Sequence, residues 1–295
     1  MRALATPPRD VLSPARLKGR IDARLGELLP GPVDHHDLVS MAMREATLGA
    51  GKRTRPLLML IAGDTLGAGL TALVDAGCAV EMVHAASLVL DDMPCMDDAD
   101  LRRGRATIHR RFGEDVAALA AIGLLSQAFA TTAAIAGVSP AVRNQLVRVL
   151  ACAIGPRGLV RGQCLDLRNA GAARVDAITD TNALKTGALF AAALDMTALL
   201  AQADPRTRSG LCTIALELGQ AFQLQDDLSD CDASTSTGKD AGQDIGKATL
   251  LAALGADEVR RRLDLHLQTV RREIALLYGD GSPLAAFCTR LFEVQ

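Results

Sequence analysis

The spacing of apolar residues predicts helices along almost the whole chain. Such residues recur every three or four positions at 17–28, 56–66, 72–90, 143–154, 183–203, 209–228 and 250–278. No segment alternates polar and apolar β-branched residues in the manner typical of a strand. The pattern therefore predicts an all-α protein that forms one domain over residues 1–295, in which 1–15, with three prolines, is a flexible arm.

One uncharged stretch, at 116–142, is long enough to cross a bilayer. It consists mostly of alanine, which is nearly neutral for membrane insertion, and is interrupted by Gly123, Ser126 and Gln127. A membrane span is the alternative, but we interpret the stretch as a helix that is buried on all sides in a bundle. We therefore expect no transmembrane segment.

Composition excludes several classes of protein. The net charge of −2 and the aromatic content of 2% exclude a nucleic-acid binder that relies on overall basicity or on base stacking. The seven cysteines include no C-x-x-C pair, so they indicate neither a common zinc site nor a disulfide framework. We expect most of these cysteines to be small buried hydrophobic residues. We also expect the protein to be located in the cytoplasm.

Two aspartate motifs follow long apolar helices. The first motif spans 91–98 and contains four aspartates; the second spans 226–230 and contains three. Solvated helix ends would be the simple explanation. However, carboxylates are unfavourable at the negative end of the helix dipole, and two of them about 4 Å apart repel by roughly 4 kcal/mol at an effective dielectric constant of 20. Converging carboxylates therefore favour a bound cation, and oxygen ligands select Mg²⁺.

The helical spacing indicates which aspartates share a face. Asp226 and Asp230 are four residues apart and therefore neighbours on one helix face. Asp91 and Asp98 are two helical turns apart, and Pro94 should distort the chain between them, which would bring Asp97 onto that face instead.

Basic residues accompany both motifs. They lie in the segment 51–56, at Arg102 and Arg103, inside an apolar helix at Lys185, and at Lys239 and Lys247 beside the polar loop 229–246. Lys185 needs a partner, because a charge in an apolar stretch is costly. Arginine binds phosphate oxygens in pairs and lysine neutralises them as a point charge. Together with Mg²⁺, these residues indicate one or two diphosphate substrates.

Two other motifs match known types of site only in part. Glu81 and His84 have the E-x-x-H spacing of di-iron bundles, but such a site needs a second copy, which the sequence lacks. The lysines at 52 and 247 do not lie in a Walker A loop, because no serine or threonine follows them directly. His84 is therefore either a core histidine or a substrate contact, and its position two turns before Asp91 on the same helix face favours the contact.

The motifs resemble those of the trans-isoprenyl diphosphate synthases, which are head-to-tail prenyltransferases. The resemblance extends over nearly the whole chain and follows the family order, and it is nearest to the bacterial geranylgeranyl type of carotenoid biosynthesis. The motifs that carry it are GKRTRP, EMVHAASLVLDDMPCMDDADLRRG, GQCLDL, KTGALF, FQLQDDLSD and GKDAGQDIGKATL.

The resemblance implies a bundle of long, mostly antiparallel helices around a deep central cavity, in a homodimer. It implies three Mg²⁺ per active site, held by Asp91, Asp97 and Asp226 with support from Asp92, Asp227 and Asp230. It assigns the allylic diphosphate to Arg102, Lys185, Gln223 and Lys239, with Lys247 nearby. It assigns isopentenyl diphosphate to Lys52, Arg55, His84 and Arg103, and it places Thr186 and Gln223 near the reacting carbons.

The implied reaction starts with ionisation of the allylic C–O bond. The double bond of isopentenyl diphosphate then attacks the cation, and the released diphosphate takes the proton. Ala86 and Ser87, one turn before Asp91, are small and leave room for a long product. The two-residue insertion Pro94-Cys95 in the first motif is also typical of the twenty-carbon product, so the sequence predicts geranylgeranyl diphosphate.

Four alternatives remain. A farnesyl diphosphate synthase would share every motif and make the fifteen-carbon product. A terpene cyclase would not need the second substrate site that Lys52, Arg55, His84 and Arg103 indicate. A non-catalytic subunit of a prenyl synthase would be expected to lack one aspartate motif. A di-metal carboxylate protein is the weakest alternative, for want of a second E-x-x-H.

Overall fold

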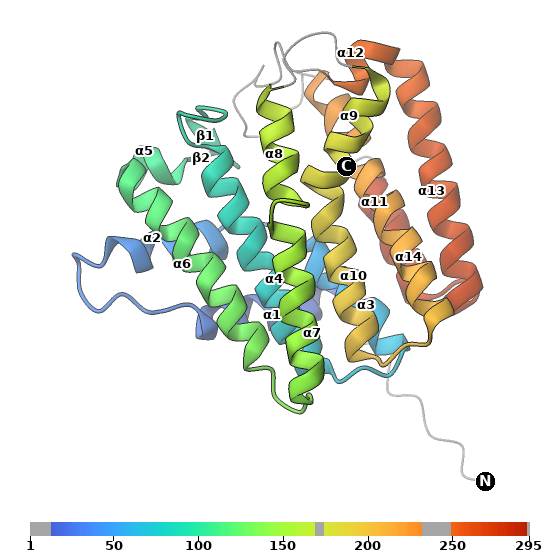
Figure 1. The fold of residues 1–295 in the computed structure, drawn as a ribbon, viewed down its shortest axis with the longest axis horizontal. Coiled ribbons are helices and arrows are strands. Elements are labelled where there is room, and N and C mark those ends of the chain that lie inside the picture. The colour runs from blue at the N-terminus through green and yellow to red at the C-terminus, as the bar shows by residue number, and fades with distance from the viewer. Residues whose placement is uncertain (1–12, 169–173, 232–248, 294–295) are drawn as a thin grey trace.

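The computed structural model describes residues 13–168, 174–231 and 249–293, without the side chains of 230 and 231 (Figure 1). The first seven helices are α1 (Pro14–Leu28), α2 (Leu38–Leu48), α3 (Thr54–Thr65), α4 (Leu70–Asp91), α5 (Ile108–Phe112), α6 (Glu114–Ala133) and α7 (Pro140–Ile154). They are followed by α8 (Leu159–Arg168), α9 (Val175–Asn182), the π-helix η2 (Ala183–Gly187), α10 (Ala188–Leu200), α11 (Pro205–Cys231), α12 (Leu250–Leu254), α13 (Ala256–Tyr278) and α14 (Pro283–Phe292).

The prediction of an all-α protein is confirmed. The only strands in the described part of the chain are β1 (Leu101–Arg102) and β2 (Arg105–Ala106), which form a two-residue antiparallel hairpin. Helix α4 packs against α3, α6 and α10, and α11 packs against α10 and α13. Most of α4 is buried, because its apolar residues surround the helix instead of forming one stripe.

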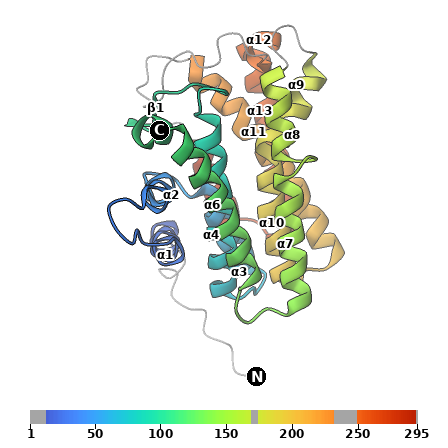
Figure 2. The ribbon, with the colours of Figure 1, turned by 60° about the vertical axis from the view of Figure 1, so that its left-hand side comes forward.

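Three described helical segments have the length and apolar composition of a membrane span: Leu70–Asp91, Glu114–Ala133 and Val175–Leu200. The second corresponds to the stretch that we expected to form one helix buried on all sides, and that expectation is wrong. Helix α6 ends at Ala133, α7 starts at Pro140, and α6 exposes 52% of Leu119 and 61% of Ile122. The reason is position: α6 packs on α4 with one face and turns the other outward (Figure 2).

Several helix boundaries differ from those that periodicity predicts. Helix α1 starts at Pro14, where the Ser13 hydroxyl caps it, so residues 14 and 15 of the expected arm are helical; residues 1–12 lie outside the described residues. The expected helix at 250–278 is two helices, because the chain turns at Gly255, whose φ of 80° suits glycine.

The expectation that most cysteines are buried is also wrong. Cys78 and Cys288 are buried, but four of the described cysteines are exposed: Cys95, Cys152, Cys164 and Cys212. These four lie on helix faces or loops whose apolar neighbours point toward the core, and sequence neighbours alone do not determine burial.

Candidate functional site

The first aspartate motif begins where α4 ends. After Asp91 the chain leaves the helix and turns back, so that the backbone N–H of Asp97 donates to the carbonyl of Asp91 at 2.9 Å. Asp98 has a left-handed backbone, with φ of 46°, and does not continue the helical face. The structure thus places Asp97 beside Asp91 through a loop, which is the outcome that the distortion at Pro94 predicted.

Carboxylates crowd at this point. Burial raises the pKa of Asp91 to about 6, and nearby Asp97 and Asp92 add to the rise, while Lys185 opposes it. Asp92 is buried, and burial raises its pKa even though Arg102 binds it closely. The Nε of Arg102 lies 2.7 Å from one oxygen of Asp92 and 2.9 Å from the other. Arg102 therefore orients Asp92 in this structure.

The second aspartate motif lies at the end of α11. Asp226 is exposed, whereas Asp227 is buried. A chain of hydrogen bonds holds Asp227: the hydroxyl of Thr186 donates to Gln223 at 3.0 Å, and the amide of Gln223 donates to Asp227 at 2.9 Å. Asp226 interacts electrostatically with Arg55. The side chain of Asp230 and the whole of Lys239 and Lys247 lie outside the described residues.

Lys185 and Thr186 occupy the π-helix η2, which joins α9 to α10. A π-helical turn widens the helix locally and is frequent at functional sites. Lys185 is half-buried, and its Nζ lies 2.6 Å from a carboxylate oxygen of Asp166. A Cβ on Gly162 would come within 2.4 Å of the backbone nitrogen of Lys185, so only glycine permits this approach of α8 to η2.

Sequence reasoning missed Asp166. It recognised that Lys185 needs a partner, and the signal for that partner was present in the motif GQCLDL, whose aspartate is Asp166. Gln163 in the same motif was also missed. It is buried, and its amide nitrogen lies 3.7 Å from the sulfur of Met96, in the loop of the first aspartate motif.

A basic cluster lies next to these carboxylates and consists of Lys52, Arg53, Arg55, His84 and Arg103. Its buried anchor is Arg53, which donates to Asp22 at 2.7 Å, to Glu81 at 3.0 Å and to the carbonyl of Gly49 at 3.1 Å. Sequence reasoning did not single out Arg53, whose φ of 52° is also unusual for a residue with a side chain.

The rest of the basic cluster surrounds Glu81. Burial lowers the pKa of His84 well below its ordinary value, and the neighbouring arginines, Arg55 first, lower it further. Burial also lowers the pKa of Arg103, whose guanidinium donates to the carbonyl of Ala50 at 2.6 Å. Neutral His84 is thus a hydrogen-bonding group among cations, which suits the recognition of an anion. Lys52 is exposed.

The two residues that we expected to limit product length differ in their surroundings. Ser87 is half-buried, as are His84 and Asp91 on the same face of α4, and its hydroxyl donates to the carbonyl of His84 at 2.9 Å. Ala86 has no exposed surface, because it points into the packed core. Of the two, only Ser87 shares the accessible face that ends at Asp91.

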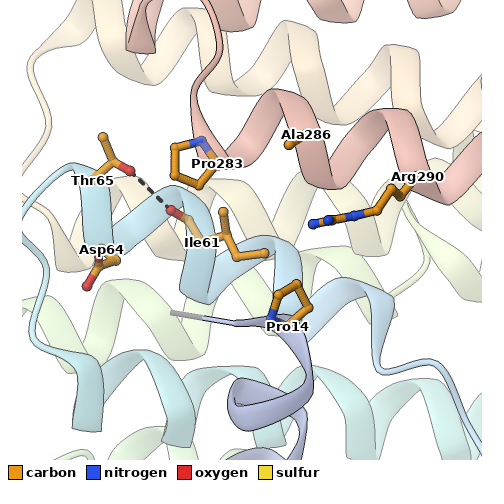
Figure 3. Close-up of a pocket in the computed structure, with 7 residues that line it drawn as sticks. All are labelled: Pro14, Ile61, Asp64, Thr65, Pro283, Ala286 and Arg290. Atoms are coloured by element: carbon orange, nitrogen blue, oxygen red, sulfur yellow. Dashed lines mark hydrogen bonds between the residues drawn. The ribbon is translucent and has the colours of Figure 1, made fainter. Parts of the chain in front are cut away.

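A hollow of about 80 Å³ lies away from these residues (Figure 3). Its lining includes Pro14, Ile61, Thr65 and Pro283, and so comes from α1, α3 and α14. It is at the C-terminal end of α3, whereas Arg55 is at the N-terminal end of that helix. The hollow is therefore not part of the site.

The described residues do not form a complete metal cage, because no group of three carboxylates, imidazoles or thiols among them is close enough. The donor chemistry nevertheless fits Mg²⁺. The available ligands are carboxylate oxygens, and burial together with the neighbouring carboxylates Asp97 and Asp92 raises the pKa of Asp91, so a bound cation would favour its ionised form. Mg²⁺ is often held by one or two carboxylates together with substrate phosphate oxygens, so an incomplete protein cage is what such a site requires.

Comparison with known proteins assigns the family. The model of the family described as polyprenyl synthetase matches residues 36–273. The chain belongs to this family. It is 47% identical over 281 residues to the geranylgeranyl diphosphate synthase of Pantoea ananas, covering 94% of this chain and 92% of that one.

Two further relatives agree. The farnesyl diphosphate synthase of Geobacillus stearothermophilus is 36% identical, over 90% of each chain. The apo structure of an FPP/GFPP synthase from Zymomonas mobilis superposes with a TM-score of 0.85 at 32% identity, covering 94% of this chain and 96% of that one. The resemblance inferred from the motifs is confirmed, and the protein is a prenyltransferase of the isoprenoid synthase fold.

Proposed function

We propose that this prenyltransferase condenses isopentenyl diphosphate with an allylic diphosphate, in a Mg²⁺-dependent reaction, to make geranylgeranyl diphosphate. The observation that carries the proposal is the convergence of two anion-binding sets with two carboxylate sets. Asp91 interacts with Lys185, Lys185 adjoins Thr186, and Thr186 is bonded through Gln223 to Asp227. The basic cluster lies alongside, linked electrostatically to Asp226 through Arg55.

In the proposed reaction, Asp91, Asp97 and Asp226 hold the metal ions, and Asp92, Asp227 and Asp230 support them. These residues would hold about three Mg²⁺ ions, which would supply positive charge to offset that of the leaving diphosphate. Lys185 interacts electrostatically with Asp91, and Arg102 binds Asp92; both contact the same diphosphate, together with Lys239 and Lys247. The Thr186–Gln223 pair presents oxygen atoms to the developing allylic cation.

The basic cluster binds the second substrate. Lys52, Arg55, His84 and Arg103 hold isopentenyl diphosphate so that its double bond faces the allylic carbon. Burial lowers the pKa values of Arg55 and Arg103, so their charged forms lack full compensation. An additional anion bound between these two cations is therefore favourable. The central cavity that the family resemblance implies would exclude water, so that the allylic cation reacts with the double bond and not with water.

Product length depends on the face of α4 that leads away from Asp91. Ser87 lies on this face and is small, so a growing chain passes it. We expect Ser87→Phe to shorten the main product to fifteen carbons. Because Ala86 is fully buried, Ala86→Phe would act on product length only through displaced neighbours, and its effect should be smaller.

We further propose that the enzyme is a homodimer that acts in the cytoplasm, without a membrane-spanning segment, and supplies carotenoid biosynthesis. The exposed apolar residues Leu119 and Ile122 on α6 support the dimer, because a second copy of the same face would cover them. Leu119→Glu with Ile122→Glu should shift the sedimentation coefficient to that of a monomer. Equal sedimentation coefficients for the native protein and the double variant would contradict this contact.

The central experiment uses purified protein, Mg²⁺ and isopentenyl diphosphate with dimethylallyl, geranyl or farnesyl diphosphate as the starter. Chromatography of the dephosphorylated products should show the twenty-carbon alcohol as the main product and no product after chelation of Mg²⁺. A main product of fifteen carbons would establish the farnesyl alternative. No turnover with any starter would indicate a non-catalytic subunit.

A further inference from the structure

Three of the six phenylalanines in the chain form one stack. Phe190 of α10 lies against Phe222 of α11 with ring centroids 5.0 Å apart, and Phe222 lies against Phe292 of α14 at 4.9 Å. Aromatic residues are scarce in this protein, so a contiguous stack that joins three helices is an unusual concentration of them. It fixes the relative positions of α10, α11 and the C-terminal helix.

The stack ends on Arg55. The guanidinium carbon of Arg55 lies over the ring of Phe190, 4.5 Å from its centroid. The Nε of Arg55 is buried and has no hydrogen-bond partner among the described residues. Burial lowers the pKa of Arg55 to about 10, so the side chain is still charged at neutral pH.

A comparison with Arg53, two residues earlier, shows what is special about Arg55. Arg53 is bonded to two carboxylates and a carbonyl, which use its N–H groups and offset its charge. Arg55 rests on an aromatic ring face, which attracts the cation. The ring does not use the N–H donors of Arg55, because these point outward in the plane of the guanidinium. An arginine held in this way keeps both its charge and its donors for a ligand.

We propose that Phe190 is a positioning residue that holds the Arg55 guanidinium for the diphosphate of isopentenyl diphosphate, and that Phe222 and Phe292 hold Phe190 in place. This inference rests on the proposed function, in which Arg55 binds that substrate. It adds a link from the C-terminal helix α14 to the substrate site. Phe222 precedes Gln223, so the same stack supports the neighbouring hydrogen-bond chain to Asp227.

The test compares Phe190→Leu with Phe190→Tyr in the full-length protein. Loss of the ring should raise the KM for isopentenyl diphosphate by about three- to tenfold, the range expected for a cation–π contact, with little change in the KM for farnesyl diphosphate. Tyrosine keeps the aromatic face and should restore the native KM. Phe287→Leu is the matched control, because Phe287 is equally buried but is not part of the stack.

A double-mutant cycle separates positioning from general damage. In an Arg55→Ala background, Phe190→Leu should raise the KM for isopentenyl diphosphate no further, because the ring acts through the guanidinium. Additive effects of the two substitutions would overturn the proposal. An equal rise in the KM values for isopentenyl and farnesyl diphosphate would also overturn it. So would an unchanged KM for isopentenyl diphosphate in a Phe190→Leu variant whose melting temperature equals that of the native protein.

Phe292→Leu tests the far end of the stack, with Phe129→Leu as a control that is also half-buried. We expect about a twofold rise in the KM for isopentenyl diphosphate for the first and none for the second. An equal effect of the two would contradict the link to α14. Failure of the proposed function is distinguishable, because the native protein would then make no prenyl product. Failure of this inference alone would leave an active enzyme whose KM for isopentenyl diphosphate does not depend on the aromatic ring at position 190.

Discussion

The acidic and basic sides of the site differ in what holds their charges in place. On the basic side, Arg53 is buried and saturated with partners from α1, α4 and the preceding turn. On the acidic side, Asp91 sits among other carboxylates, and its pKa is raised to about 6. Folding alone therefore completes the basic side, whereas the proposed Mg²⁺ would complete the acidic side. Under the proposed function, one substrate site is preorganised and the other would be assembled with its metal.

A seam of small residues joins α8, η2 and α11 beside the acidic side. Gly162 of α8 lies against η2, and a Cβ on Gly219 of α11 would come within 2.6 Å of the Cα of Gly187. These glycines let three helical segments approach closely enough for Lys185 to reach the first motif while Thr186 reaches Gln223. Substitutions on the acidic side, the basic side and this seam should consequently fail in different ways.

The largest effect should come from the acidic side. Asp91→Asn removes a carboxylate of the proposed metal site and should lower kcat by about a hundredfold or more, as is typical when a group that stabilises transition-state charge is lost. Steady-state rates at several Mg²⁺ concentrations measure this. Asp98→Asn is the matched control in the same motif, because Asp98 is exposed and faces Arg110 at 3.5 Å. Equal losses for the two variants would contradict the assignment.

Next in size is the effect of removing the counter-charge of the basic cluster. Glu81 is buried and 3.0 Å from Arg53, so Glu81→Gln leaves the buried Arg53 guanidinium with Asp22 as its remaining carboxylate partner. The free energy of unfolding should fall by about 3 kcal/mol, measured by urea denaturation. Glu27→Gln breaks only an exposed pair with Arg24 and should cost less than about 1 kcal/mol. A cost for Glu81→Gln as small as that of Glu27→Gln would mean that the basic side is not preorganised by this contact.

A smaller effect is expected at the seam. Gly162→Ala places a Cβ within 2.4 Å of the Lys185 backbone and should destabilise the protein by about 2 kcal/mol through overpacking. Gly26→Ala in α1 meets nothing within 4 Å and should instead stabilise by up to about 1 kcal/mol, because alanine is the better helix former. Thermal unfolding of both variants distinguishes close packing from helix propensity; a stabilising Gly162→Ala would remove the seam from the comparison.

The smallest effect depends on pH. The folded pKa of Asp91, about 6, is above its unfolded value of 3.8, so its contribution to stability is present below about pH 4 and is lost as the pH rises through 6. Asparagine does not ionise, so Asp91→Asn should melt about 3 °C above the native protein at pH 7 and together with it at pH 4, both without metal. A constant difference across this pH range would show that Asp91 is not crowded by charge.

The sequence by itself determined most of the helices and the chemistry of the site. Helical periodicity is a local property, so α3, α4, α7 and α11 appear within a few residues of their predicted bounds. The aspartate motifs could be recognised because each is contiguous in the chain, and the basic residues because they lie in short segments near those motifs in the sequence or inside an apolar helix. The local sequence also predicted that Asp97 lies beside Asp91, because Pro94 must break the helix after Asp91.

Only the tertiary structure decided which groups meet. Asp166 and Lys185 are 19 residues apart, Arg53 and Glu81 are 28 apart, and the stack from Arg55 to Phe292 spans most of the chain. It also decided that α6 is exposed on one side and that the helix widens at Lys185. The physical reason is that periodicity specifies which face of a helix is apolar but not which helix covers it. Contacts between distant segments depend on how the whole set of faces packs.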